Sequence, residues 1–321
     1  MRNNRVLAVA GDQKILILAV LIGAVMGVLY PRFLGFENII SILVKISIEG
    51  VIFIGLTYLI ILGEIDLSVG SVMALCSAMS IIGQEHGVFV GVAAGLLTGL
   101  AAGIVNGLLV VKLRIASIAV TLGMMVLLNG IVFVITKSLA PAGGNYSIAG
   151  TNPGFRLITD TTLFGVPTLI LILAFLLAVF AFVLQRTVFG RNIYATGGNL
   201  VASRYANIKV DSVRISAFAL TGLLAGLAGV LLSAKYNIAS WQIGTNTPLF
   251  VITAVLLGGV SLSGGEGSLL RAFQGLLLVG VIDSMVVNLK IYSSARLMML
   301  GALLIIMLSV DGIRIKKERY S

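Results

Sequence analysis

Hydroxyl and carboxylate side chains that could hydrogen-bond a polar solute are concentrated in two short breaks within apolar sequence. The breaks are GEIDLSVGS at 63–71 and GGVSLSGGEGS at 258–268. Backbone released from helical hydrogen bonding cannot face lipid, so each break must pack against protein or line an aqueous cavity. The alternative is a simple turn, with Asp66 or Ser68 capping the next helix. The candidate pathway residues in the breaks are Asp66, Ser68, Ser71, Ser261 and Ser263.

Other polar side chains lie within apolar segments, where a charge is costly and should face the protein interior or water. Asp283 is followed within two turns by a serine and an asparagine, so this cluster is a further candidate for a solute pathway. Asn129 is a candidate too, although an amide in such a segment more often bonds a neighbouring helix. Lys45 lies one turn before Glu49, which favours a local ion pair over a solute contact.

The sequence does not indicate an enzyme. It contains no GxxxxGK[ST] phosphate-binding loop, so any energy from ATP must arrive from another chain. His86 is the only histidine, which predicts neither a metal site nor a serine nucleophile activated by histidine. We therefore expect no catalytic residues, no metal and no cofactor in this chain.

The composition predicts an all-α integral membrane protein. Of the 321 residues, 59% are hydrophobic and 11% are charged, and long apolar runs alternate with short polar segments. The net charge of +10 collects beside the apolar runs, which is typical of membrane topology rather than of nucleic-acid binding. We expect one transmembrane domain over 1–321, a polytopic bundle of about ten helices, some of them broken. The expected spans are 15–30, 46–62, 67–82, 88–111, 115–135, 166–184, 215–234, 249–260, 272–289 and 293–310.

Charge asymmetry predicts the orientation of this bundle. With ten spans and a cytoplasmic N-terminus, which carries Arg2 and Arg5, 15 of the 22 Lys and Arg residues lie inside and 7 outside. The C-terminus and the basic loop 185–215 are then cytoplasmic. The largest external loop is 137–165, whose Gly, Asn, Ser and Thr residues favour turns at the surface.

The basic loop 185–215 has an internal pattern of its own. Gly197 and Gly198 are expected to interrupt the chain, and Asn199 is a good N-cap for a helix over 200–206. Val201 and Tyr205 lie one turn apart, so this helix could present an apolar face to a docking protein. A solvated connecting loop is the alternative.

Three motifs carry a resemblance to a known family: IDLSVGS at 65–71, FGRNIYATGGN at 189–199 and LLGGVSLSGGEGS at 256–268. In order and spacing they resemble the permease subunits of bacterial ABC importers of the ribose or monosaccharide type. The resemblance implies a second permease copy, a cytoplasmic subunit that binds ATP and Mg²⁺, and a periplasmic or lipid-anchored solute-binding protein. It makes 190–207 the segment that docks on the ATPase. The residues implied in coupling are Gly190, Arg191, Tyr194, Gly197, Gly198, Asn199 and Arg204.

The resemblance implies an inner-membrane permease that imports a small-molecule sugar, such as ribose, by ATP-driven alternating access. Two stretches, TPLFVITAVLLGG at 247–259 and RIASIAVTLG at 114–123, differ from common members, which leaves the sugar open. Furanose signals, polyols and other sugars are alternatives within the family. A partner-independent secondary transporter and a structural membrane scaffold are alternatives outside it.

Overall fold

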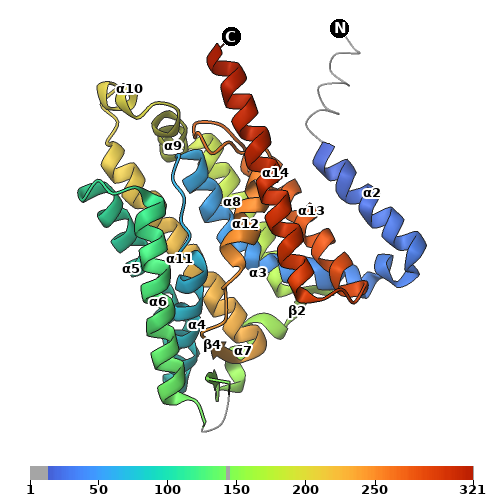
Figure 1. Ribbon diagram of the computed structural model, residues 1–321. Coiled ribbons are helices and arrows are strands. Elements are labelled where there is room, and N and C mark those ends of the chain that lie inside the picture. The colour runs from blue at the N-terminus through green and yellow to red at the C-terminus, as the bar shows by residue number, and fades with distance from the viewer. Residues whose placement is uncertain (1–13, 142–144, 321) are drawn as a thin grey trace.

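Apolar helices account for most of the protein (Figure 1). The structure, a computed structural model, describes residues 14–141 and 145–320. The N-terminal arginines predicted to be cytoplasmic and three residues of the loop 137–165 lie outside these ranges. Every predicted span overlaps one helix, and these helices are α2 (Lys14–Leu29), α3 (Phe36–Ile61), α4 (Val69–Gly83), α5 (Val88–Lys112), α6 (Ser117–Leu139), α8 (Thr168–Arg186), α11 (Val210–Tyr236), α12 (Thr247–Leu257), α13 (Leu269–Asn288) and α14 (Ser293–Tyr320).

The number of membrane crossings does not follow directly from the number of helices. Within residues 14–141 and 145–320, six helices are long and apolar enough to cross a bilayer alone, namely α3, α5, α6, α8, α11 and α13. The short helices α4 and α12, with 15 and 11 residues, lie beside the two polar breaks. The predicted count of ten crossings therefore stays a prediction. Helix α3 begins ten residues before the predicted second span, with Glu37 in its first turn.

Short elements occupy the two ends of the bundle (Figure 1). At one end lie α9 (Val188–Gly198), α10 (Leu200–Tyr205) and the second polar break, and we call this the junction end. The opposite end holds η1 (Pro31–Leu34), η2 (Gln84–His86), β1 (Ser147–Ala149), α7 (Pro153–Asp160), β2 (Thr162–Leu163), β3 (Val166–Pro167) and β4 (Ile238–Ser240). Segments predicted to be cytoplasmic thus share one end, as the predicted topology requires.

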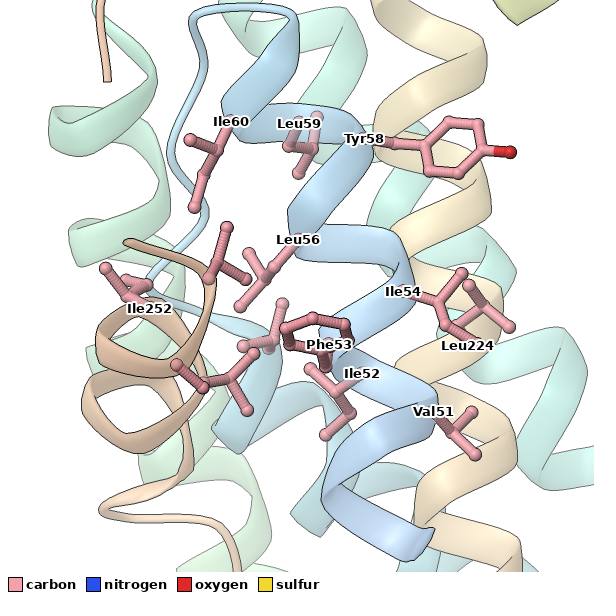
Figure 2. Close-up of a cluster of buried hydrophobic side chains, with 14 of the residues drawn as sticks. Val51, Ile52, Phe53, Ile54, Leu56, Tyr58, Leu59, Ile60, Leu224 and Ile252 are labelled. Carbon is pink, nitrogen blue, oxygen red and sulfur yellow. The ribbon is translucent and has the colours of Figure 1, made fainter. Parts of the chain in front are cut away.

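Helix α3 lies at the centre of the bundle. Every residue from Val51 to Ile61 is buried, because this part of the helix is apolar around its whole circumference. Figure 2 shows these side chains between α11, which contributes Leu224, and α12, which contributes Ile252. A helix enclosed in this way moves only together with its neighbours, so α3 can transmit a displacement from one end of the protein toward the other.

Glycines set the contact between α5 and α11. Gly99 and Gly103 of α5 face Gly222 and Gly226 of α11, and a Cβ on Gly222 would lie 2.3 Å from the carbonyl oxygen of Gly99. The backbones therefore touch directly, as small residues allow between membrane helices. This contact fixes α11 against α5 with no side chain between them.

Candidate functional site

The two polar breaks and the basic loop meet at the junction end. The amide of Gly265, in the second break, donates a 2.7 Å hydrogen bond to the carbonyl oxygen of Ile61, the last residue of α3. Gly197 lies against both, because a Cβ there would be 2.0 Å from that carbonyl oxygen and 2.7 Å from the Gly265 nitrogen. We call the contact of Ile61, Gly197 and Gly265 the three-way junction. It brings the FGRNIYATGGN and LLGGVSLSGGEGS motifs together at the end of α3. Gly63 of the first break lies beside it, since a Cβ on Gly264 would be 3.0 Å from the Gly63 Cα.

Two aromatic side chains extend the three-way junction. The Tyr194 hydroxyl donates a 2.8 Å hydrogen bond to the carbonyl oxygen of Gly267. Burial raises the pKa of Tyr194, despite the opposing effect of nearby Arg271, so the hydroxyl keeps its proton at neutral pH. The Phe189 ring stacks on Tyr58 of α3 with ring centroids 6.2 Å apart. Helix α9 is therefore held to α3 and to the second break by several independent contacts.

The predicted coupling residues divide between the interior and the surface. Gly190 packs closely, since a Cβ there would lie 2.0 Å from the carbonyl oxygen of Leu184. Arg191, Asn199 and Arg204 are exposed, and Arg204 pairs with Asp211 at 3.6 Å. The inward residues could transmit a motion, whereas the exposed ones could contact a partner.

One sequence expectation about this loop was wrong. Gly197 and Gly198 do not interrupt the chain but form the last two residues of α9, a helix that the sequence analysis did not predict. Position 197 requires glycine because any Cβ there would clash with the carbonyl oxygen of Ile61. This contact between distant segments could not be predicted from the sequence. Two neighbouring glycines usually disfavour a helix, so the local signal pointed to a turn.

The short helix predicted after the glycines is confirmed. The Asn199 side chain caps α10 by accepting a 2.9 Å hydrogen bond from the amide of Ala202. Val201 and Tyr205 are 61% and 89% exposed. A pair of exposed apolar side chains on a basic helix suits a docking surface.

The first polar break packs against protein. Asp66 is 1% exposed and accepts hydrogen bonds from the amide and the hydroxyl of Ser68 at 2.8 and 2.6 Å. Asn106 of α5 donates to the Ser68 hydroxyl at 2.8 Å. The hydroxyls of Ser117 and Thr121 accept from backbone amides of the break at 3.3 and 3.1 Å. Helix α4 starts where the capping alternative placed it, although its N-cap Ser68 makes no side-chain cap bond.

The other candidate pathway residues lie in separate places. The Ser71 hydroxyl donates to the Ser68 carbonyl at 2.8 Å. The Ser261 and Ser263 hydroxyls are 2.7 Å apart, within the second break beside the three-way junction. Asn129 is half-buried on α6. The structure thus does not bring these serines and Asn129 together around one cavity, and their contact with solute stays a prediction.

Glu64, in the first polar break, pairs with Arg214 of α11. The Arg214 Nε donates to Glu64 at 2.7 Å, and the side chains are 17% and 10% exposed. The pair lies between the first break and the start of α11. The sequence shows Arg214 only as one of several basic residues in its loop. Its pairing with Glu64 could not be predicted, because the two residues are 150 positions apart.

Two cavities lie toward the opposite end, and the smaller one is lined by the buried carboxylate of Asp283. The larger, about 490 Å³, lies between α3, α4, α11 and α12 and is lined by polar and aromatic side chains. The smaller, about 210 Å³, is lined by Asn38, Asp283, Ser284 and Asn288. Lys45 borders both cavities and forms an ion pair with Asp283. The predicted polar cluster around Asp283 therefore does line a cavity. Lys45 pairs with Asp283 on α13, a partner that could not be predicted from the spacing between Lys45 and Glu49.

We expect Lys45→Met to lower stability more than Asp283→Asn. The Asp283 side chain is 3% exposed, so removal of Lys45 takes the cation from a desolvated carboxylate, whereas the asparagine of the second variant is neutral. Because Lys45 is 44% exposed, water offsets part of the effect, and we expect a loss of about 1–3 kcal/mol. Thermal unfolding in detergent measures it. The double variant should be more stable than Lys45→Met alone; additive losses would contradict the pairing.

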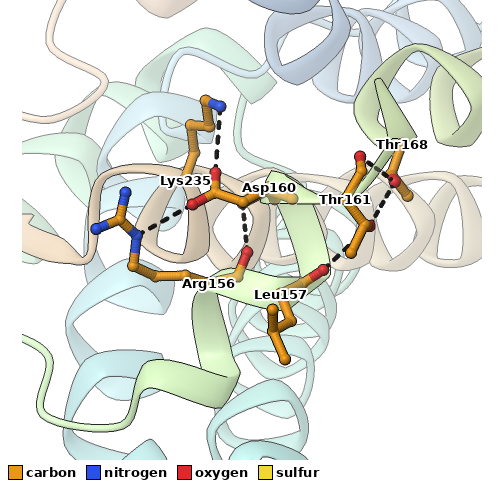
Figure 3. Close-up of polar contacts among 7 residues, drawn as sticks. Arg156, Leu157, Asp160, Thr161, Thr168 and Lys235 are labelled. Carbon is orange, nitrogen blue, oxygen red and sulfur yellow. Dashed lines mark hydrogen bonds and ion pairs between the residues drawn. The ribbon is translucent and has the colours of Figure 1, made fainter. Parts of the chain in front are cut away.

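The opposite end carries a small ordered platform, made of β1, α7, β2–β3 and β4. Figure 3 shows Asp160, the last residue of α7, between Arg156 and Lys235, at 3.2 and 3.3 Å. β1 pairs antiparallel with β4. The sequence predicted only a turn-rich loop here, so α7 was not expected. Its signal was Asn152 followed by proline, since that asparagine caps the helix by accepting from Gly154 at 2.9 Å.

Comparisons with known proteins match this chain to one family of transport permeases. The profile of the family "Branched-chain amino acid transport system / permease component" matches residues 38–308. The chain is 35% identical to the ribose import permease protein RbsC of Escherichia coli K12, over 94% of each chain. It is 35% identical to RbsC of Bacillus subtilis, over 89% of this chain and 88% of that protein.

A third relative is named for L-arabinose rather than ribose. The chain is 31% identical to the L-arabinose ABC transporter permease protein AraH of Azospirillum brasilense, over 92% of this chain and 86% of the relative. No solved structure matches the chain. The similarity therefore extends over nearly the whole length of several sugar permeases.

Proposed function

Because the chain belongs to the family of permease subunits of ABC sugar importers of the ribose or monosaccharide type, we propose that it imports a monosaccharide such as ribose by ATP-driven alternating access. It is a multi-pass inner-membrane protein of a sugar import system, which includes an ATPase and a substrate-binding protein. ATP and Mg²⁺ would be bound by the ATPase rather than by this chain.

The three-way junction is the observation that carries this proposal. Helices α9 and α10 present exposed side chains at the junction end, and Gly197 of α9 touches the end of α3 and the second break. A push on α9–α10 from closing ATPase domains would move both at once. Since α3 is buried along its inner half, such a push would reorient the bundle between two states.

The cavities support a sugar path through this chain. The 490 Å³ cavity is in the size range of small-molecule sites and combines Tyr236 and Phe250 with Gln242, Asn246 and Lys45. Aromatic faces and amide groups suit the apolar face and the hydroxyls of a sugar ring. We propose that sugar enters here, beside the Lys45–Asp283 pair, and that the buried serines of the two breaks act nearer the junction end.

The arrangement of partners follows from the same proposal. The junction end would face the cytoplasm with both termini, which agrees with the excess of Lys and Arg predicted on that side. The platform with α7 would then face outward and receive the solute-binding protein. A second permease copy would complete the path.

Reconstitution tests the proposal. The chain should take up labelled ribose into liposomes only when its ATPase, its binding protein and ATP are all present. L-Arabinose and a polyol serve as competing solutes, because the relatives carry different sugars in their names. Uptake by the chain alone, driven by an ion gradient, would instead support a secondary transporter. ATP-driven uptake of another solute would keep the mechanism and replace ribose as the substrate.

A further inference from the structure

A second large cavity lies at the junction end, away from the proposed sugar path. It measures about 680 Å³ and lies where the end of α5, the start of α6, α10 and the start of α11 come together. Its charged lining residues are Lys112, Arg114, Arg204, Asp211 and Arg214. Four cations against one carboxylate make it a strongly basic cavity.

Two of these cations are already neutralised by neighbours. Arg214 pairs with Glu64, and Arg204 pairs with Asp211 at 3.6 Å. Lys112 and Arg114 are exposed, and neither forms an ion pair within the part of the chain that the structure describes. The cavity therefore keeps two positive charges that a bound anion would neutralise.

The backbone around Arg114 adds to this preference. Arg114 has a φ of 57°, a left-handed conformation that long side chains rarely adopt, so a guanidinium is held where glycine would fit more easily. Helix α6 starts three residues later without a side-chain cap, and the positive end of its dipole points to the same region. The start of α6 favours a bound oxyanion, and the backbone of Arg114 sets only where its guanidinium begins.

Apolar side chains place this cavity at the edge of the bilayer. Leu113 and Ile115 flank the cations and are 60% and 42% exposed, and Ile118 and Leu122 continue the exposed apolar surface along α6 at 49% and 48%. Such a surface on a membrane span contacts acyl chains. The cations therefore lie at the level of phospholipid headgroups.

We propose that this cavity binds the phosphate of an anionic phospholipid from the leaflet on the junction side, with Lys112 and Arg114 as the main contacts. A general excess of cytoplasmic cations would not require them to converge on one cavity, whereas a headgroup site does. Bound there, the lipid would touch Arg204 of α10 and thereby the segment proposed to dock on the ATPase. Local lipid composition would then affect coupling.

Lipid retention measures the site directly. The purified wild-type protein should keep phosphatidylglycerol or cardiolipin through detergent exchange, as counted by native mass spectrometry. Lys112→Gln/Arg114→Gln should retain about thirtyfold less, because each of the two cations near a headgroup contributes roughly 1 kcal/mol. Lys209→Gln is the matched control, since Lys209 is exposed at the same end but does not line the cavity.

Three outcomes would overturn the proposal. One is equal retention by the wild type and the double variant. Another is retention by the wild type of a zwitterionic lipid as readily as an anionic one. The third is binding of soluble glycerol phosphate or inorganic phosphate without lipid. Size-exclusion profiles and thermal unfolding show that the variants are folded before lipids are counted.

Discussion

Gly197→Ala should lower ATP-driven uptake by about tenfold or more while leaving ATP hydrolysis by the assembled transporter largely intact. The new Cβ would lie 2.0 Å from the carbonyl oxygen of Ile61 and 2.7 Å from the amide of Gly265. Both are backbone atoms, so α9 must shift away from α3 and from the second break. A motion of α10 would then no longer reach the bundle. Uptake and ATPase rates in the same proteoliposomes measure the uncoupling.

Gly198→Ala is the matched control for this change. It makes the same substitution one residue along the same helix, but its Cβ would be 3.8 Å from the nearest heavy atom, the Cα of Gly265. The family resemblance also implied Gly198 in coupling, but Gly198 is exposed and a Cβ there would make no close contact, so we expect uptake close to that of the wild type. Tyr194→Phe removes only the hydrogen bond to Gly267 and should have an intermediate effect. If Gly197→Ala and Gly198→Ala transport equally well, the three-way junction does not transmit force.

A second large effect is expected on stability, from Gly222→Ala. Its Cβ would lie 2.3 Å from the Gly99 carbonyl oxygen and 2.6 Å from the Gly103 Cα. Overpacking in a filled interior typically costs about 1–3 kcal/mol, and here the neighbours are backbone atoms that cannot rotate away. We expect a loss at or above the upper end of that range, measured as a lower midpoint of thermal unfolding in detergent.

Gly130→Ala on α6 provides the comparison, because no heavy atom lies within 4 Å of the Cβ that it adds. Alanine also favours a helix over glycine by up to about 1 kcal/mol, so this variant should be at least as stable as the wild type. Equal destabilisation by Gly130→Ala would show that glycine content itself, rather than the α5–α11 contact, sets the stability.

Sequence patterns predicted most of the helices and singled out two of the three segments that meet at the three-way junction. Apolar runs locate helices because a span needs a nearly continuous apolar surface, and Asn199 marked α10 because capping is a local interaction. What could not be predicted depends on contacts between distant segments. Gly197 and Gly198 are equivalent in the sequence, yet only one of them faces Ile61.

The charged residues illustrate the same limit. Lys45 pairs with Asp283, which is 238 positions away, although its nearest acidic neighbour in the sequence, Glu49, lies on the same helix. Asp66 and Ser68 fit both a cap and a pathway in the sequence. The structure surrounds them with Asn106 and backbone amides, which favours a structural role without testing contact with solute.

The three-way junction consists of main-chain atoms. The stiffness of this contact is therefore set separately from the choice of partner, which depends on surface side chains. A contact between a glycine, an amide and a carbonyl offers no side chain to vary, so its stiffness is nearly independent of the rest of the sequence. The exposed side chains of α10, such as Val201 and Tyr205, are free to change. Under the proposed coupling, changes in a few surface residues of α10 would adapt the permease to a different ATPase subunit, while the main-chain contact that transmits the motion would stay the same.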